Sequence, residues 1–170
     1  SDRFVEGGSM NTALMIATLF CSLTAGFVFA FATVVMPGLR KMEDGDFLRA
    51  FQLIDGVIQN KQPLFMLMWV GSIVAVLVAL VVAFGSLAGV DRVLLLTAGM
   101  LYFGGVQLPT FRVNVPLNNE LKRLDVDALD PEERRSVREA FEPRWNRWNS
   151  IRTAFASLSV ALMMILLIRL

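Results

Sequence analysis

The chain contains four long stretches in which hydrophobic residues follow one another almost without charged residues. They cover residues 12–36, 63–87, 93–112 and 147–168. An α-helix rises about 1.5 Å per residue, so about 20 residues cross the roughly 30 Å hydrocarbon core of a bilayer. None of the stretches alternates apolar and polar positions as the strands of a membrane barrel do. The pattern therefore predicts an all-α protein, a bundle of four transmembrane helices.

The connections between these stretches differ in length. A tight hairpin joins the second stretch to the third. The connection at 37–62 begins Pro-Gly and carries apolar residues at helical spacings, which favours a short helix against the membrane or the bundle. In the longest connection, 113–147, Asp130, Pro131 and the acids that follow are helix-start signals. We therefore expect short cytoplasmic helices in both long connections.

The domain organisation is expected to be simple. Residues 1–9, SDRFVEGGS, precede a methionine and have the composition of a vector-derived remnant. Residues 10–170 are predicted to form a single four-helix membrane domain.

Composition excludes several classes of function. The net charge is +1, and the basic residues of 122–147 are matched by acids, so no nucleic-acid partner is expected. The single cysteine, Cys21, allows no disulfide within the chain. There is no histidine, and the four stretches hold no carboxylate cluster, so we predict neither a metal site nor a haem. No cofactor is expected.

The basic residues are distributed unevenly about the predicted spans. Thirteen lie in or beside the two long connections, and three lie near the termini and the hairpin. Basic residues favour the cytoplasmic side of a membrane. We therefore predict a multi-pass protein of the cell membrane with both termini outside and both long connections cytoplasmic.

Small residues recur along the first two stretches at spacings of three and four, the pattern that favours close helix packing in lipid. They are predicted to be contacts within the bundle. In the first stretch these residues are Ser22, Gly26, Ala30 and Thr33, and in the second they are Ser72, Ala75, Ala79 and Ala83.

Polar residues gather near the end of the third stretch. Gln107, Thr110 and Asn114 are spaced i, i+3 and i+7, so they share a face while the helix persists. Pro116 is expected to end that helix and to turn Asn118 back toward the same side. Polar side chains at this depth suggest a function, because an unpaired polar group in hydrocarbon costs several kcal/mol.

A second polar group opens the fourth stretch. Trp145, Trp148, Asn149 and Arg152 lie at i, i+3, i+4 and i+7, on one stripe of a helix. One interpretation is an interfacial belt, with tryptophan at headgroup level and arginine reaching outward. The other is a polar network shared with the third stretch. The belt does not explain Asn149, and the sequence leaves both interpretations open.

If the third and fourth spans are neighbours, the two polar groups face each other across a pocket. Such a pocket suits a hydrophobic small molecule that carries an oxygen or a negative charge. The sequence assigns no catalytic residue. If the function requires a side chain that accepts a proton, the candidates are Asp55, Glu120 and Tyr102. The predicted binding residues are Gln107, Arg112, Asn114, Asn118, Trp148, Asn149 and Arg152.

The segments NVPLNNELKRL and RWNRWNSIRTAFASLSVAL, together with the opening AGFVFAFATVVMPGLRKM, resemble the DUF1772 or anthrone oxygenase-like family. The resemblance implies a small four-helix membrane protein. It also implies oxidation of anthrones to anthraquinones by molecular oxygen without an evident cofactor, as linked to fungal members. The positions that match are Asn114, Pro116, Asn118, Trp148, Asn149, Arg152 and Thr153. The lack of histidine departs from an expected histidine base.

Three functional hypotheses follow. The first is a cofactor-free oxygenase acting on a hydrophobic oxygenated aromatic substrate between the third and fourth spans. The second is a non-catalytic lipid-binding or accessory membrane protein, with a groove open to lipid or a homo-oligomer interface on the tryptophan stripe. The third is a structural bundle in which the polar residues only fix helix register. Membrane lipids are expected partners in each case.

Overall fold

The computed structural model describes residues 2–170, and of residues 2–7 only the backbone. Every regular element in this range is helical. The elements are α1 (Asp2–Ala30), η1 (Phe31–Val35), α2 (Met36–Leu39), α3 (Asp44–Gln59), α4 (Pro63–Phe84), α5 (Gly89–Met100), η2 (Leu101–Gln107), η3 (Thr110–Asn114), α6 (Val115–Lys122) and α7 (Pro131–Arg169).

The described residues contain four helices that are long and apolar enough to cross a membrane, as the hydrophobic pattern predicts. They are Gly8–Leu39, Pro63–Phe84, Gly89–Lys122 and Pro131–Arg169. The all-α, four-helix membrane fold is therefore confirmed. Three of the helices are longer than the apolar stretches that predicted them, because polar residues continue each helix beyond the hydrophobic run.

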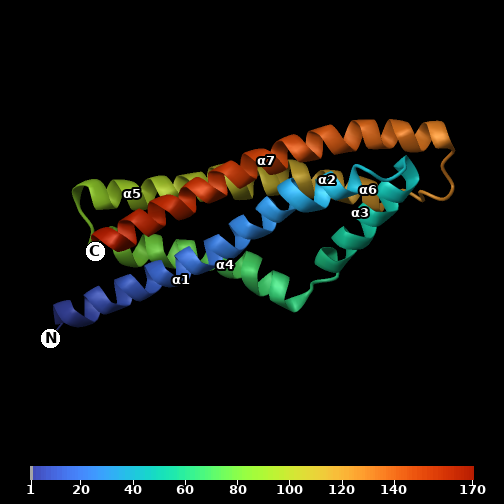
Figure 1. The fold of residues 1–170 in the computed structure, drawn as a ribbon. Helices are drawn as coiled ribbons and strands as arrows, with labels where there is room; N and C mark the ends of the chain where they lie inside the picture. The colour runs from blue at the N-terminus through green and yellow to red at the C-terminus, as the bar shows by residue number, and fades with distance from the viewer. Residues whose placement is uncertain (1) are drawn as a thin grey trace.

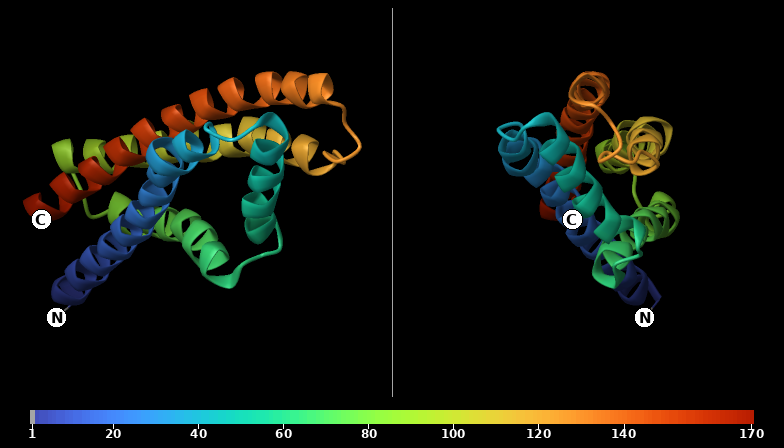
Figure 2. Two further views of the ribbon diagram at one scale, coloured as in Figure 1. Left: turned by 45° about the vertical axis from the view of Figure 1, so that its right-hand side comes forward. Right: turned by 90° about the vertical axis from the view of Figure 1, so that its right-hand side faces the viewer.

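The long helices run side by side, and the molecule has two distinct ends (Figure 1). Both termini and the α4–α5 turn lie at one end, where Gly89 adopts a positive φ of 53°. The other end holds α2, α3, α6 and the start of α7. There α3 lies at a steep angle to α7 and carries the chain back toward α4 (Figure 2). Both long connections therefore meet at one end of the bundle.

Three turns of π-helix interrupt the spans, and each one ends two residues before a proline. The segments η1, η2 and η3 precede Pro37, Pro109 and Pro116 respectively. In each case the residue just before the proline donates its backbone N–H to the carbonyl oxygen five residues earlier. The three acceptors are the carbonyl oxygens of Phe31, Phe103 and Thr110. Proline lacks an N–H and crowds the carbonyl four residues back, and the wider π turn accommodates both defects. The helix therefore continues through every one of these prolines.

This continuity corrects the expectation that Pro116 ends the third helix. Val115 keeps right-handed helical angles, with φ −64° and ψ −46°, and α6 runs on to Lys122. Asn118 therefore does not return by a turn. It lies about one helical turn beyond Asn114, on the same side of a continuous helix.

The start of the last helix agrees with the sequence. Asp130 accepts a hydrogen bond from the Glu133 backbone N–H at 2.9 Å, and the Glu133 side chain accepts one from the Asp130 N–H at 2.9 Å. This reciprocal capping box satisfies two N–H groups that the helix leaves unpaired. The helix then continues through Pro143 to Arg169, so the expected short helix and the fourth span are one element.

The small residues predicted to form bundle contacts do so on α4, but those predicted on α1 do not. Ser72, Ala75, Ala79 and Ala83 are buried. Gly26, in contrast, is exposed, and a Cβ added there would meet nothing within 4 Å. The buried face of α1 carries instead Leu14, Ala17, Cys21, Ala25 and Val28. The predicted stripe on the first span was therefore wrong.

Two sets of contacts fix α3 against α7. The ring of Phe51 packs on Phe141 and Trp145, with centroid separations of 4.7 and 5.4 Å. Arg138 of α7 donates to the Asp44 carboxylate at 3.0 Å. It also donates to the Arg40 and Met42 carbonyl oxygens, each at 2.8 Å. A helix from the first connection is thus held at a defined position beside the spans.

Candidate functional site

A cavity of about 400 Å³ lies where α3 meets the spans. This volume is within the roughly 300–1,000 Å³ range of small-molecule sites. Its walls come from α1, η1, α3, α4, η3, α6 and α7. The expected pocket between the third and fourth spans is therefore present in a wider form, because α1, α3 and α4 complete it.

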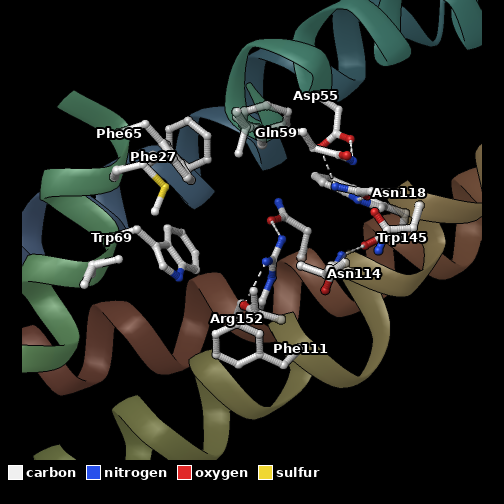
Figure 3. A pocket seen from close by; sticks show the side chains of 18 of the residues that line it. Phe27, Asp55, Gln59, Phe65, Trp69, Phe111, Asn114, Asn118, Trp145 and Arg152 are labelled. Carbon is white, nitrogen blue, oxygen red and sulfur yellow. Dashed lines mark hydrogen bonds between the residues drawn. The ribbon is translucent and has the colours of Figure 1, made fainter. Parts of the chain in front are cut away.

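The two sides of the cavity differ in chemistry (Figure 3). One side is aromatic and carries Phe27, Phe65 and Trp69. Phe65 stacks on Trp69 with an interplanar angle of 20° and a centroid separation of 5.6 Å. Phe27 meets Phe65 at 5.2 Å. Such flat apolar surfaces accept the face or edge of an aromatic ligand. The opposite side is polar and carries Asp55, Asn114, Asn118 and Arg152.

Arg152 is the cationic group of that polar side. Its side chain is 5% exposed. Nη1 donates to Thr110 Oγ1 at 3.0 Å, and Nη2 donates to Asn149 Oδ1 at 2.7 Å. Both acceptors are neutral, and none of the described carboxylates forms an ion pair with Arg152. Its Nε is buried and has no hydrogen-bond partner among the described residues.

The two neutral acceptors are themselves oriented toward Arg152. Thr110 donates its hydroxyl proton to the Val106 carbonyl oxygen at 2.7 Å, so its oxygen is left to accept. Asn149 donates through Nδ2 to the Val28 carbonyl oxygen at 3.0 Å, so its Oδ1 faces the guanidinium. The bundle thus holds a cation in place without neutralising its charge.

Asn114 presents a second polar atom without a partner. It is 2% exposed, and its Nδ2 lies 3.4 Å from the Trp145 carbonyl oxygen. Its Oδ1 is buried and has no hydrogen-bond partner among the described residues. Buried polar groups in proteins are almost always paired. Two residues of the cavity lining, Arg152 and Asn114, therefore each keep one buried polar atom without a hydrogen-bond partner among the described residues.

A chain of hydrogen bonds connects Asp55 to the fourth span. Trp145 Nε1 donates to Asn118 Oδ1 at 2.8 Å, and Asn118 Nδ2 donates to Asp55 Oδ1 at 2.7 Å. Gln59 donates to the other carboxylate oxygen of Asp55. Burial raises the pKa of the Asp55 carboxyl above its usual range, although these two donors and the Lys122 charge oppose that shift. The cavity therefore contains an oriented carboxyl group.

The structure brings together four of the seven predicted binding residues and separates the other three. Asn114, Asn118, Asn149 and Arg152 all line the cavity. Arg112 is exposed and lies outside the cavity lining. It follows Thr110 by two residues, so it points away from that face of the helix. Trp148 is half-buried at the edge of the predicted stripe and also lies outside the lining.

Gln107 takes part in a different network. It is buried, accepts from Trp69 Nε1 at 3.2 Å and donates to the Tyr102 hydroxyl at 2.8 Å. Tyr102 is in turn hydrogen-bonded to Ser72. These contacts join the second and third spans beside the cavity, and Gln107 is not part of its lining.

The three residues of the aromatic side are not identified by the sequence. Phe27, Phe65 and Trp69 lie in continuous apolar runs, where nothing distinguishes a cavity wall from an ordinary core position. Asp55 does give a signal, because it is a lone acid within the apolar segment FQLIDGVI. The sequence indicates Asp55 only as a candidate base and does not predict that it lines the pocket.

Fold and site together define a class: an integral membrane protein with four spans around an aromatic and polar cavity. The family model described as anthrone oxygenase matches residues 65–162, more than half of the chain. The chain therefore belongs to the anthrone oxygenase-like family, and the resemblance seen in its motifs is confirmed. Comparisons with curated proteins and with solved structures found no match.

Proposed function

We propose that this protein is a cofactor-independent oxygenase that oxidises a hydrophobic aromatic substrate bearing a carbonyl or hydroxyl oxygen. The observation that carries the proposal is Arg152, a buried arginine in the cavity wall with a free Nε and no carboxylate partner. A cation kept in this state costs several kcal/mol of stability unless something compensates its charge. An anionic substrate oxygen in the cavity supplies that compensation.

The proposed reaction follows from this electrostatic arrangement. Loss of a proton from an activated ring carbon gives an anion whose charge is delocalised onto the carbonyl oxygen. The Arg152 guanidinium stabilises that oxygen without reorganisation, as preorganised donors do in oxyanion sites. The electron-rich anion then reduces molecular oxygen directly. For an anthrone, one O₂ converts the ring CH₂ to a second carbonyl and releases one water, so atoms and electrons balance without a cofactor.

The family's name supports this reaction, and the aromatic side of the cavity supports a flat substrate. Phe65 and Trp69 present stacked rings opposite the polar wall. A polycyclic ligand lies against these rings while its oxygen reaches Arg152. Oxygen is itself apolar, and an apolar cavity beside lipid suits its entry.

We further infer that the site lies at the cytoplasmic face of the cell membrane. Thirteen of the sixteen basic residues lie in or beside the two long connections, which meet at the end that carries α2, α3, α6 and the start of α7. The positive-inside rule then leaves both termini outside. The outer faces of the spans contact membrane lipids, since large apolar side chains such as Leu64, Val81 and Ile168 are 72%, 79% and 85% exposed.

The test is oxygen consumption by purified protein in lipid nanodiscs with anthrone as the substrate, corrected for the protein-free rate. We expect one O₂ consumed per anthraquinone formed. Arg152→Ala should lower the rate by roughly 100-fold or more, as removal of one oxyanion donor does. Arg147→Ala, an exposed arginine of the same helix, is the matched control and should retain the rate. A wild-type rate equal to the protein-free rate would overturn the proposal.

The same protein sample separates this function from lipid binding. A lipid-binding protein retains a phospholipid in the cavity after detergent purification, and anthrone does not displace it. An oxygenase releases any such lipid when anthrone or the quinone is added. Native mass spectrometry of wild-type protein and Arg152→Ala distinguishes these outcomes.

A further inference from the structure

We infer that Asp55 is the general base that removes the substrate proton, and that Asn118 and Gln59 are the residues that position it. This inference rests on the proposed function, which requires a deprotonation but does not identify the group that performs it. It assigns a catalytic role to a residue of α3, outside the spans.

Of the three candidate bases, Asp55 is the one that lines the cavity. Asp55 is 5% exposed and belongs to the cavity lining. Glu120 is exposed on α6 and lies outside that lining. Tyr102 is completely buried, is hydrogen-bonded to Ser72 and Gln107, and also lies outside it. With no histidine in the chain, Asp55 is the candidate that a substrate in this cavity can meet.

The orientation of the Asn118 amide is fixed by its neighbour. The indole N–H of Trp145 can only donate, so the atom that it meets, Asn118 Oδ1, must be the amide oxygen. Nδ2 then necessarily faces Asp55 and donates to it. The amide of Gln59 donates to the second carboxylate oxygen. Each oxygen of Asp55 thus receives one N–H and keeps a lone pair for a substrate proton.

The charges around Asp55 suit a base. Lys122 of α6 donates to Gln59 Oε1 at 2.7 Å and stands one side chain away from the carboxylate. Arg152 of α7 lies in the same cavity wall, and α2, which also packs on α3, contributes no charged residue. Burial raises the pKa of Asp55 while Lys122 opposes the rise. The carboxyl is therefore more basic than that of an exposed aspartate.

Asp55 alone can perform all the proton transfers of the reaction. Asp55 takes a proton from the ring CH₂, and the electron pair moves onto the carbonyl oxygen beside Arg152. O₂ accepts electrons from the carbanion and forms a C–O bond, and Asp55 returns its proton to the distal peroxide oxygen. Asp55 then removes the second C–H proton as the O–O bond breaks, the new C=O forms and hydroxide leaves. That proton converts hydroxide to water, and the carboxylate is regenerated.

Deuterium exchange under anaerobic conditions tests this step apart from the oxidation. Anthrone is incubated in D₂O with protein in nanodiscs and without oxygen, and exchange at its CH₂ is followed by NMR. We expect wild-type protein to accelerate exchange above the protein-free rate. Asp55→Asn should reduce the acceleration by roughly 100-fold or more, the usual range for loss of a general base. Glu120→Gln should exchange as the wild type does, and Asp55→Glu should restore part of the rate.

Two further measurements distinguish a catalytic role from a merely structural one. Binding of 2-hydroxyanthraquinone reports that Asp55→Asn is folded with an intact cavity. Asn118→Leu should lower the rate of exchange and displace its pH profile, which a merely structural residue would not do. Exchange at the wild-type rate in Asp55→Asn, or no acceleration by the wild type, would overturn the role of Asp55. Exchange without oxygen consumption would leave Asp55 as the base and overturn the oxygenase.

Discussion

Asn149 accepts a hydrogen bond of 2.7 Å from Nη2 of Arg152, so a neutral amide stands where a carboxylate ordinarily neutralises a buried guanidinium. Asn149 is in turn fixed by its donation to the Val28 carbonyl oxygen of the first span. The bundle therefore orients the cation without cancelling its charge. In the proposed function, this charge stabilises an anionic oxygen of the substrate.

Changing this amide to an acid tests the importance of the uncancelled charge. In Asn149→Asp a carboxylate pairs with Arg152 at hydrogen-bond distance and cancels the charge of its guanidinium. We expect affinity for an anionic quinone to fall by at least roughly tenfold, since a close charge pair is worth several kcal/mol even when partly solvated. Asn146→Asp places the same charge on α7 outside the cavity lining and serves as control. Fluorescence or absorbance titration of both variants measures the effect, and equal affinities would contradict it.

Replacing Arg152 by methionine separates a ligand-binding arginine from a structural one. Removing a desolvated charge relieves a penalty of several kcal/mol, which offsets the hydrogen bonds lost by Thr110 and Asn149. We therefore expect the thermal unfolding midpoint of Arg152→Met to be no lower than that of the wild type, while quinone binding is lost. If the arginine only fixes helix register, the midpoint instead falls by about 5 °C or more. Thermal denaturation in nanodiscs distinguishes the two.

The contact of the third and fourth spans depends on one glycine. A Cβ added to Gly105 would lie 2.3 Å from Cγ and 2.5 Å from Cβ of Phe155. Cβ of Phe155 cannot move away without its backbone, so Gly105→Ala must separate the helices that carry Asn114 and Arg152. We expect a loss of about 1–3 kcal/mol, as in other overpacked contacts, together with weaker quinone binding. Gly104→Ala adds the same methyl where nothing lies within 4 Å, and it should leave stability and binding almost unchanged.

The pH dependence follows from the raised pKa of Asp55. The base must be ionised, so kcat/KM should rise with pH through that pKa and then level off, with a midpoint above the ordinary value of about 4. Lys122 lowers this pKa, so Lys122→Gln should move the midpoint to higher pH. The free energy of unfolding depends on pH in the opposite direction. The contribution of Asp55 to it is complete below the pKa of this carboxyl in the unfolded chain, and it is lost as the pH rises through the higher pKa of the folded protein. A rate that is independent of pH across this range would contradict the assignment.

Sequence periodicity predicted the spans and part of the polar lining of the cavity for the same physical reason. Thr110, Asn114, Asn149 and Arg152 are polar residues at helical spacing within apolar runs, and such residues must face inward. Asn118 lies beside them for a reason that the sequence did not predict. The chain does not turn back at Pro116, because the π turn at η3 allows the helix to continue past this proline. The local preferences of proline predict that the helix ends there. The wider π turn accommodates the missing N–H and the proline ring, so the helix does not end.

The remaining parts of the site depend on contacts between distant segments. Asp55 reaches the cavity because Phe51 and Arg138 fix α3 against α7, and no pattern within α3 gives that position. Gln107 has the same spacing and polarity as its neighbours, yet Trp69 and Tyr102 bind it elsewhere. Which buried polar residues form a network and which face a cavity is decided by packing between helices.

The most direct test of an uncancelled cation in the cavity is the ionisation of a bound phenol. In nanodiscs, 2-hydroxyanthraquinone is bound at saturation and titrated by absorbance, since its phenolate absorbs at longer wavelength. We predict that the bound phenol ionises at a pH about one unit or more lower in the wild type and Arg147→Ala than in Arg152→Ala, where one unit corresponds to about 1.4 kcal/mol. The same ionisation midpoint in wild type and Arg152→Ala would contradict the account.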